Sequence, residues 1–166
     1  MASGRDRHIV VMIIIPGHIE EFQQNFKHMK DSINVEWTGK MSFEADVAGH
    51  KIALDADPTV GGENKGPKPK PLMMVALAGC TGMDVVSILT KMRVNFEGLN
   101  IKVEGDLTEE HPKKFTAMKI IYEVKGKDLP LDKIEKAVQM SEEKYCGVSA
   151  VYKDVIDLSY EIKLIG

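Results

Sequence analysis

Residues 72–89 read Leu-Met-Met-Val-Ala-Leu-Ala-Gly-Cys-Thr-Gly-Met-Asp-Val-Val-Ser-Ile-Leu, with a single charge on Asp84. Apolar residues occupy nearly every side of a helix drawn through this run, which is typical of a buried helix. Its glycines and polar residues make it a poor membrane span. Gly79 and Gly82 flank Cys80, and each costs roughly 1 kcal/mol relative to alanine inside a helix. We therefore predict a central buried helix with a cysteine near its middle.

The segment before this helix is rich in glycine and proline. Half of residues 58–71 are one or the other, a density that regular helices and strands do not tolerate. We expect a loop that ends at Pro71, which suits the first position of the helix. The run 61–66 lacks the Gly-Lys-Ser/Thr ending of a phosphate-binding loop, so we do not expect nucleotide binding there.

Alternating apolar residues predict strands on both sides of the helix. Runs over 35–47 and 51–55, broken by Gly39-Lys40 and Gly49-His50, indicate a three-stranded meander with one apolar face. Two further strands start near Leu99 and Phe115 and are joined by the polar loop 108–114, and the last strand spans 155–165.

A second amphipathic helix follows Pro130 and precedes the last strand. We expect it to end at Cys146-Gly147, with Gly147 as the C-terminal cap, and we place Glu142 off its buried side. The expected buried stripe comprises Leu131, Ile134, Ala137, Val138 and Tyr145. Strands and helices do not alternate one for one, so the order predicts an α+β fold with a mainly antiparallel sheet.

The N-terminal segment 1–31 forms a separate part of the pattern. Residues 9–15 are apolar and 18–30 are amphipathic; the apolar run is too short for a bilayer and no cleavage pattern follows it. We expect an N-terminal appendage or leader over 1–31, made of a strand and a helix, and one domain over 32–166. We expect a cytoplasmic protein.

Composition excludes several partner classes. The net charge is −3, which gives no bulk attraction to nucleic acid or acidic membranes. The five histidines are scattered without metal-ligand spacing relative to the cysteines. We therefore expect no nucleic acid, no membrane, no metal and no cofactor.

Cys80 and Cys146 are the only cysteines in the chain. A pair this sparse indicates a reducing compartment rather than a disulfide scaffold, and the plain alternative is two inert buried thiols. If the sulfurs meet, a sulfenic acid on Cys80 would condense with Cys146, which requires Cα atoms within about 7 Å. Asp84, one turn after Cys80, would oppose thiolate formation.

Two blocks of sequence resemble one known family. Residues 66–85 contain Gly66-Pro67-Lys68-Pro69 leading into the helix with Ala78-Gly79-Cys80-Thr81-Gly82-Met83-Asp84-Val85, and residues 143–150 contain Glu143-Lys144-Tyr145-Cys146-Gly147-Val148-Ser149-Ala150. Over about residues 33–165 the chain resembles the OsmC/Ohr family of cysteine-dependent hydroperoxide reductases.

The resemblance implies a fold and a mechanism. The fold would be OsmC-like, with antiparallel sheets packed around two central helices in an intertwined homodimer and an active site at the subunit interface. Cys80 would be the peroxidatic thiol and Cys146 the resolving thiol. The substrates would be organic or inorganic hydroperoxides, and a dithiol or thiol protein would serve as reductant.

The chain departs from the family pattern at two positions. Characterised members pair the first cysteine with an arginine from the early strands and a glutamate just before the helix, yet residues 33–79 contain no arginine and Lys70-Pro71 precede Leu72. Glu63, or else Lys40 or Lys51, is the candidate to take part of this role, whereas Arg93 lies at the far end of the helix. The alternative function is a non-catalytic protein that binds a small apolar ligand at the dimer interface. The residues that would line an apolar pocket, if they are not simply core, are Met73, Met74, Met83 and Met140.

Overall fold

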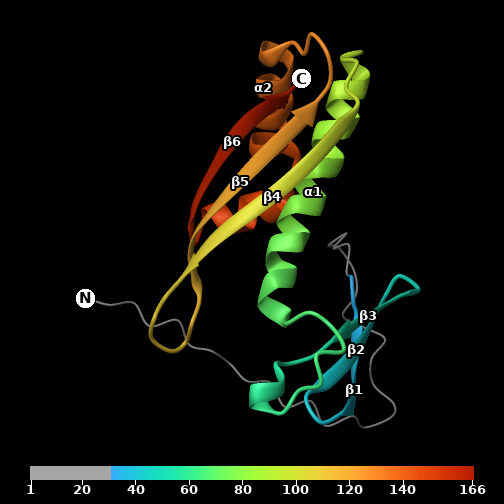
Figure 1. The fold of residues 1–166 in the computed structure, drawn as a ribbon, viewed down its shortest axis with the longest axis vertical. Coiled ribbons are helices and arrows are strands. Elements are labelled where there is room, and N and C mark those ends of the chain that lie inside the picture. Colours follow the sequence, from blue (N-terminus) through green and yellow to red (C-terminus); the bar gives the residue numbers. More distant parts are fainter. Residues whose placement is uncertain (1–30) are drawn as a thin grey trace, which may run out of the picture. The chain divides into compact units, whose positions relative to one another are not determined.

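The computed structural model describes residues 31–166, so the strand and helix expected over residues 9–30 lie outside the described residues. The unit Ile33–Gly166 has an α+β fold, as predicted, with two three-stranded sheets, three α-helices and two shorter helical turns (Figure 1).

The first sheet is the predicted meander. It consists of β1 (Asn34–Gly39), β2 (Ser42–Val47) and β3 (His50–Leu54), all antiparallel. Its two turns contain residues in the left-handed region, Lys40 with φ 49° and Gly49 with φ 83°.

The apolar face of this sheet remains largely uncovered by the described residues. Val35 and Phe43 are 43% and 39% exposed, and Trp37 is 66% exposed. Exposed clusters of large apolar side chains on a folded chain mark interaction surfaces. The meander was therefore predicted correctly, but its apolar face does not build a core with the rest of residues 31–166.

The Gly/Pro-rich loop is tied down against the end of β3. The carboxylate of Asp55 accepts hydrogen bonds from the backbone N–H groups of Ala56, Glu63 and Lys65 at 2.8, 2.9 and 3.0 Å. A Cβ atom at Gly62 would lie 2.0 Å from the Ala56 carbonyl oxygen. The loop therefore requires this glycine for close backbone approach.

We expect Asp55 to make the domain sensitive to acid. Hydrogen bonds from the backbone N–H groups of Lys65, Glu63 and Ala56 lower the pKa of Asp55 to about 2. Because the folded pKa lies below the unfolded value of about 3.9, this stabilisation is present above pH 4 and is lost as the pH falls towards 2. Thermal melting of wild type and Asp55→Asn between pH 7 and pH 2 checks this. The wild-type advantage should shrink over the acidic part of that range, and a constant difference would contradict it.

The cysteine-bearing helix is α1 (Pro69–Lys91). It begins two residues earlier than predicted, with Pro69 rather than Pro71 at the first helical position, where a missing N–H costs nothing. Its buried residues are Leu77, Thr81, Val85, Ile88 and Leu89.

The prediction that α1 is buried all round is wrong for the part of the chain that the structure describes. Val75 and Met83 are 61% and 72% exposed, because the described elements cover only one side of the helix. By length and composition alone, α1 could also cross a membrane. That is weak evidence, since the core helices of globular domains pass the same test, and α1 packs on β4, α2 and α3.

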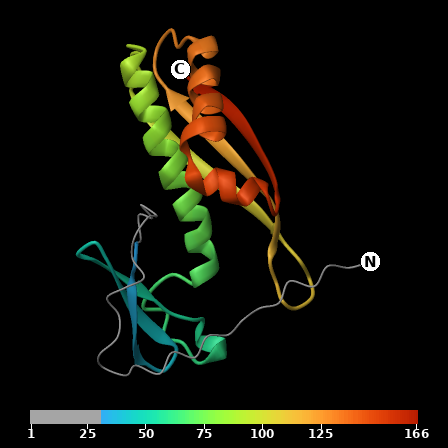
Figure 2. The same ribbon diagram turned by 180° about the vertical axis from the view of Figure 1, so that it is seen from behind.

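The second sheet carries the core of the unit. It is ordered β4 (Gly98–Leu107), β5 (Phe115–Lys125) and β6 (Asp157–Ile165), with β4 and β5 antiparallel and β5 and β6 parallel. The helices lie on one face of this sheet (Figures 1 and 2). The central strand β5 supplies the largest buried side chain, Tyr122.

The second predicted helix is divided into three pieces. Helix α2 (Leu131–Met140) is followed by a π turn (Ser141–Tyr145) and then by α3 (Gly147–Lys153). Gly147 therefore begins a helix rather than capping one, and Cys146 is the N-cap of α3.

The π turn also corrects the predicted buried stripe. The N–H of Cys146 donates to the carbonyl of Ser141, five residues back, at 2.9 Å. This wider turn changes which side chains face the core. Glu142 is only 6% exposed, whereas Tyr145 is 57% exposed, the reverse of the prediction for both. Leu131, also expected in the stripe, is 46% exposed because it begins the helix.

Candidate active site: two thiols and a carboxylate between α1 and α3

Cys80 lies near the middle of α1 and faces α3. It is half-buried, and its neighbour Thr81 is fully buried on the core side of the helix. Asp84 follows at four residues, so its carboxylate lies on the same surface of α1 as the Cys80 thiol, as predicted.

Cys146 is held at the start of α3. Its Sγ accepts a hydrogen bond from the backbone N–H of Ser149 at 3.3 Å, and the side chain is 3% exposed. A sulfur takes the place of the usual N-cap oxygen. The π turn directly before Cys146 sets the orientation of this residue at the site.

The structure brings both predicted cysteines together. The Sγ atoms of Cys80 and Cys146 and a carboxylate oxygen of Asp84 all lie within 4.8 Å of one another. Both thiols are free. Two sulfurs at this separation can form a disulfide bond after modest side-chain rotation, so an oxidised Cys80 is within reach of Cys146.

The environment opposes ionisation of Cys80. Burial raises the pKa of the Cys80 thiol, and its hydrogen bond with Cys146 raises it further. The N–H of Val148, at the start of α3, lowers the pKa, while the charge of Asp84 raises it. Since the thiolate is the nucleophile, the single chain holds Cys80 mainly as the thiol at neutral pH.

A buried network of polar side chains supports the site from the core side. In order, it runs through Asp84, Ser141, Thr81, Tyr122, Glu142 and Lys153. Ser141 Oγ donates to Asp84 Oδ2 at 3.0 Å and also lies 3.0 Å from Thr81 Oγ1. The phenol of Tyr122 hydrogen-bonds Thr81, which couples β5 to the helix that carries Cys80.

Glu142 closes the network beside Cys146. Its carboxylate lies 3.3 Å from the Tyr122 hydroxyl, 3.4 Å from Ser149 Oγ and 3.0 Å from Lys153 Nζ. Sequence reasoning missed Glu142, Ser141 and Tyr122. No signal could have found Glu142, because its burial follows from the π turn rather than from a helical period.

Glu63, the tentative third catalytic residue, is engaged elsewhere in the single chain. Its carboxylate pairs with Lys40 Nζ at 2.9 Å and Lys65 Nζ at 2.7 Å, in the loop before α1. Lys51 pairs with Glu44. Arg93 follows the last turn of α1 and lies roughly 20 Å along the helix axis from Cys80. A role for Glu63 in catalysis therefore stays a prediction.

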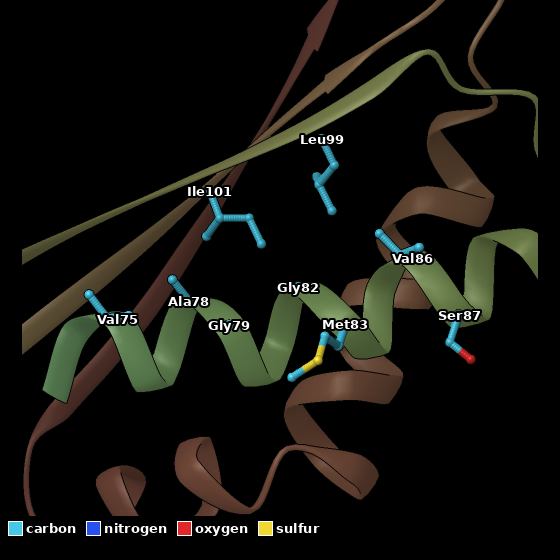
Figure 3. Close-up of a pocket in the computed structure, with 9 residues that line it drawn as sticks. All are labelled: Val75, Ala78, Gly79, Gly82, Met83, Val86, Ser87, Leu99 and Ile101. Atoms are coloured by element: carbon cyan, nitrogen blue, oxygen red, sulfur yellow. The ribbon is translucent and has the colours of Figure 1, made fainter. Parts of the chain in front are cut away.

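An open apolar groove runs along α1. It has a volume of 620 Å³ and is lined by residues of α1 and β4 (Figure 3). Gly79, the residue before Cys80, and Met83 both contribute to it, whereas Cys80 does not line it. Met74 and Met140 instead pack against the core. The groove would suit an apolar substrate, ligand or partner surface.

Two sheets, a long central helix and a pair of facing thiols define an α+β protein with a paired-cysteine site. The family model described as OsmC-like protein matches residues 62–161. The chain therefore belongs to the OsmC-like family.

Individual relatives agree with this assignment. Protein YhfA of Escherichia coli K12 is 30% identical over 132 residues, covering 79% of this chain and 96% of the relative. A protein from Aquifex aeolicus VF5 has a similar structure, with a TM-score of 0.70, 30% identity and coverage of 84% and 100% of the two chains. The organic hydroperoxide resistance protein OhrB of Bacillus subtilis shares the fold at a TM-score of 0.58 and 17% identity, with coverage of 80% and 96%.

Proposed function

We propose that the protein reduces organic or inorganic hydroperoxides through Cys80, with Cys146 as the resolving thiol. The observation that carries the proposal is the meeting of two free thiols, far apart in the sequence, within 4.8 Å of each other. Family membership supports the same chemistry. The reducing cytoplasm is the compartment in which such a pair stays free between turnovers.

The proposed reaction has three steps. The Cys80 thiolate attacks one peroxide oxygen, which breaks the O–O bond and, after proton transfer, gives a sulfenic acid and an alcohol, or water when the peroxide is inorganic. The Cys146 thiol then displaces the sulfenic hydroxyl as water and forms the Cys80–Cys146 disulfide. A dithiol or thiol protein restores both thiols by exchange. The raised pKa of Cys80 predicts slow attack on the peroxide at neutral pH.

We further propose a homodimer in which a second chain covers the exposed apolar surfaces. The groove on α1 and the apolar face of the first sheet leave Val75, Met83 and Trp37 more than half exposed. Apolar surface of this extent favours association between copies of a chain. Sedimentation equilibrium of the full chain measures the oligomeric state, and a monomer at all concentrations would contradict this proposal.

The apolar groove also supports the alternative function, binding of a small apolar ligand without catalysis. Its lining includes Val75, Leu99 and Ile101 and has no charged residue. The two functions differ in what they require of the thiol: catalysis needs Cys80, whereas ligand binding in the groove does not.

Hydroperoxide consumption separates the two functions. We expect wild type to consume cumene hydroperoxide in the presence of a dithiol, faster at alkaline than at neutral pH, and Cys80→Ser to fall to the rate of protein-free buffer. Wild type alkylated at its thiols provides a control without mutation. Equal rates for wild type and Cys80→Ser would exclude the peroxidase and leave the ligand-binding function.

A further inference from the structure

The carboxylate of Asp84 and the two thiols together form a candidate set of metal ligands. Cys80, Asp84 and Cys146 each offer one ligand atom, and these atoms lie within 4.8 Å of one another. Cys80 and Asp84 are one helical turn apart on α1, and Cys146 approaches from the start of α3. The three ligands thus come from two elements that the core packing holds against each other.

The distances suit a small tetrahedral metal centre. Zinc binds thiolate sulfur at about 2.3 Å and carboxylate oxygen at about 2.0–2.2 Å, so neighbouring ligand atoms lie roughly 3.4–3.8 Å apart. The observed separations of up to 4.8 Å therefore need to contract by at most about 1.4 Å, which rotation of the three side chains supplies. Thiolates favour zinc and similar soft metals over calcium or magnesium.

Hydrogen bonds around the three side chains already orient them. Ser141 Oγ holds Oδ2 of Asp84 at 3.0 Å, which leaves Oδ1 for a metal. The N–H of Ser149 points at the Cys146 sulfur, and that of Val148 hydrogen-bonds Cys80. Donors in these positions stabilise the negative charge of bound thiolates and carboxylates and fix ligand direction.

We propose that Cys80, Asp84 and Cys146 of the reduced protein bind a zinc ion, with a fourth position open to a small ligand. Binding releases the two thiol protons to solvent, and the complex carries a formal charge of −1, from one Zn²⁺ and three anionic ligands. Disulfide formation would remove both sulfur ligands, so metal binding and oxidation exclude each other. The site requires only the reduced thiols and does not depend on peroxidase activity.

Cobalt is the probe for this site, because thiolate-to-cobalt charge transfer gives near-ultraviolet absorption that zinc lacks. Titration of the reduced full chain with Co²⁺ should give this absorption at one ion per chain, and Zn²⁺ should abolish it. Cys80→Ser and Cys146→Ser should each remove much of the band. Asp84→Asn should weaken binding roughly 10- to 100-fold, whereas Asp106→Asn, an exposed carboxylate on β4, should bind like wild type.

Two results would overturn the metal site. One is the absence of charge-transfer absorption in wild type whose two thiols are shown to be reduced. The other is full absorption both in Asp84→Asn and in one of the two single cysteine variants. Circular dichroism verifies that each variant is folded, and alkylated wild type tests the thiols without mutation. Cobalt binding without peroxide consumption would retain the metal site and exclude the peroxidase. Peroxide consumption without cobalt binding would retain the peroxidase and exclude the metal site.

Discussion

Cys146→Ser should be oxidised once by peroxide and then fail to return to the thiol through a disulfide. The structure places the Cys146 sulfur within 4.8 Å of Cys80, so in wild type the sulfenic acid has a partner at once. Without that partner the sulfenic acid persists and further peroxide carries it to the irreversible sulfinic and sulfonic acids. We therefore expect a loss of nearly all turnover with excess peroxide.

Intact-protein mass spectrometry measures the difference without any reductant. After one equivalent of peroxide, wild type should lose two hydrogens, and Cys146→Ser should gain one oxygen, then two and three as peroxide increases. Ser159→Ala, which changes a hydroxyl on β6 away from the thiols, is the matched control and should form the disulfide as wild type does. A stable sulfenic acid in wild type would remove Cys146 from the mechanism, and no oxygen gain in the variant would show that Cys80 is not the thiol that reacts with peroxide.

Local patterns in the sequence predicted most of the elements, because each pattern reports on its own segment. Period-two alternation located the meander, and the glycine and proline density located the loop before α1. Predictions from these local patterns failed at the π turn, which no helical or strand period describes. Gly147 after Cys146 has the form of a helix C-cap, but the π turn ends early enough for a new helix to start there.

The candidate site could be predicted only in part from the residues themselves. The sequence separation between Cys80 and Cys146 carries no information about their distance in space, so the resemblance to a family, and not the spacing, predicted their pairing. The hydrogen-bond network that supports the site could not be predicted from the sequence for a different reason. Thr81, Tyr122 and Glu142 meet only when α1, β5 and the π turn pack together, and no single segment encodes that.

The sequence also predicted that α1 is buried on all sides, whereas the described residues leave one side of it exposed. Its sequence is apolar around the whole helix, and the described part of the chain covers only the side that carries Leu77, Val85 and Leu89. The uncovered residues Val75 and Met83 are the ones the proposed second chain would bury. The sequence pattern would then describe the assembled protein, of which the single chain is one half.

Tyr122→Ala should destabilise the domain more than any other single truncation considered for this site. The ring is fully buried on the central strand and packs edge-on against Tyr160, with centroids 6.4 Å apart. Removing a large buried aromatic ring costs about 3–5 kcal/mol. The change also removes one of the hydrogen bonds of Thr81 and one of those of the buried Glu142, at about 0.5–1.5 kcal/mol for each bond lost. The sum approaches the whole stability of a typical domain, about 5–15 kcal/mol.

Tyr122→Phe is the matched variant that separates packing from hydrogen bonding. It keeps the ring and its contact with Tyr160 but loses the hydroxyl, so we expect a cost of about 1–3 kcal/mol. Urea unfolding of the reduced proteins measures both free energies. Because the hydroxyl joins the helix of Cys80 to the turn before Cys146, Tyr122→Phe should also slow disulfide formation after peroxide addition. A wild-type rate of disulfide formation in this variant would show that the network stabilises the fold without positioning the thiols.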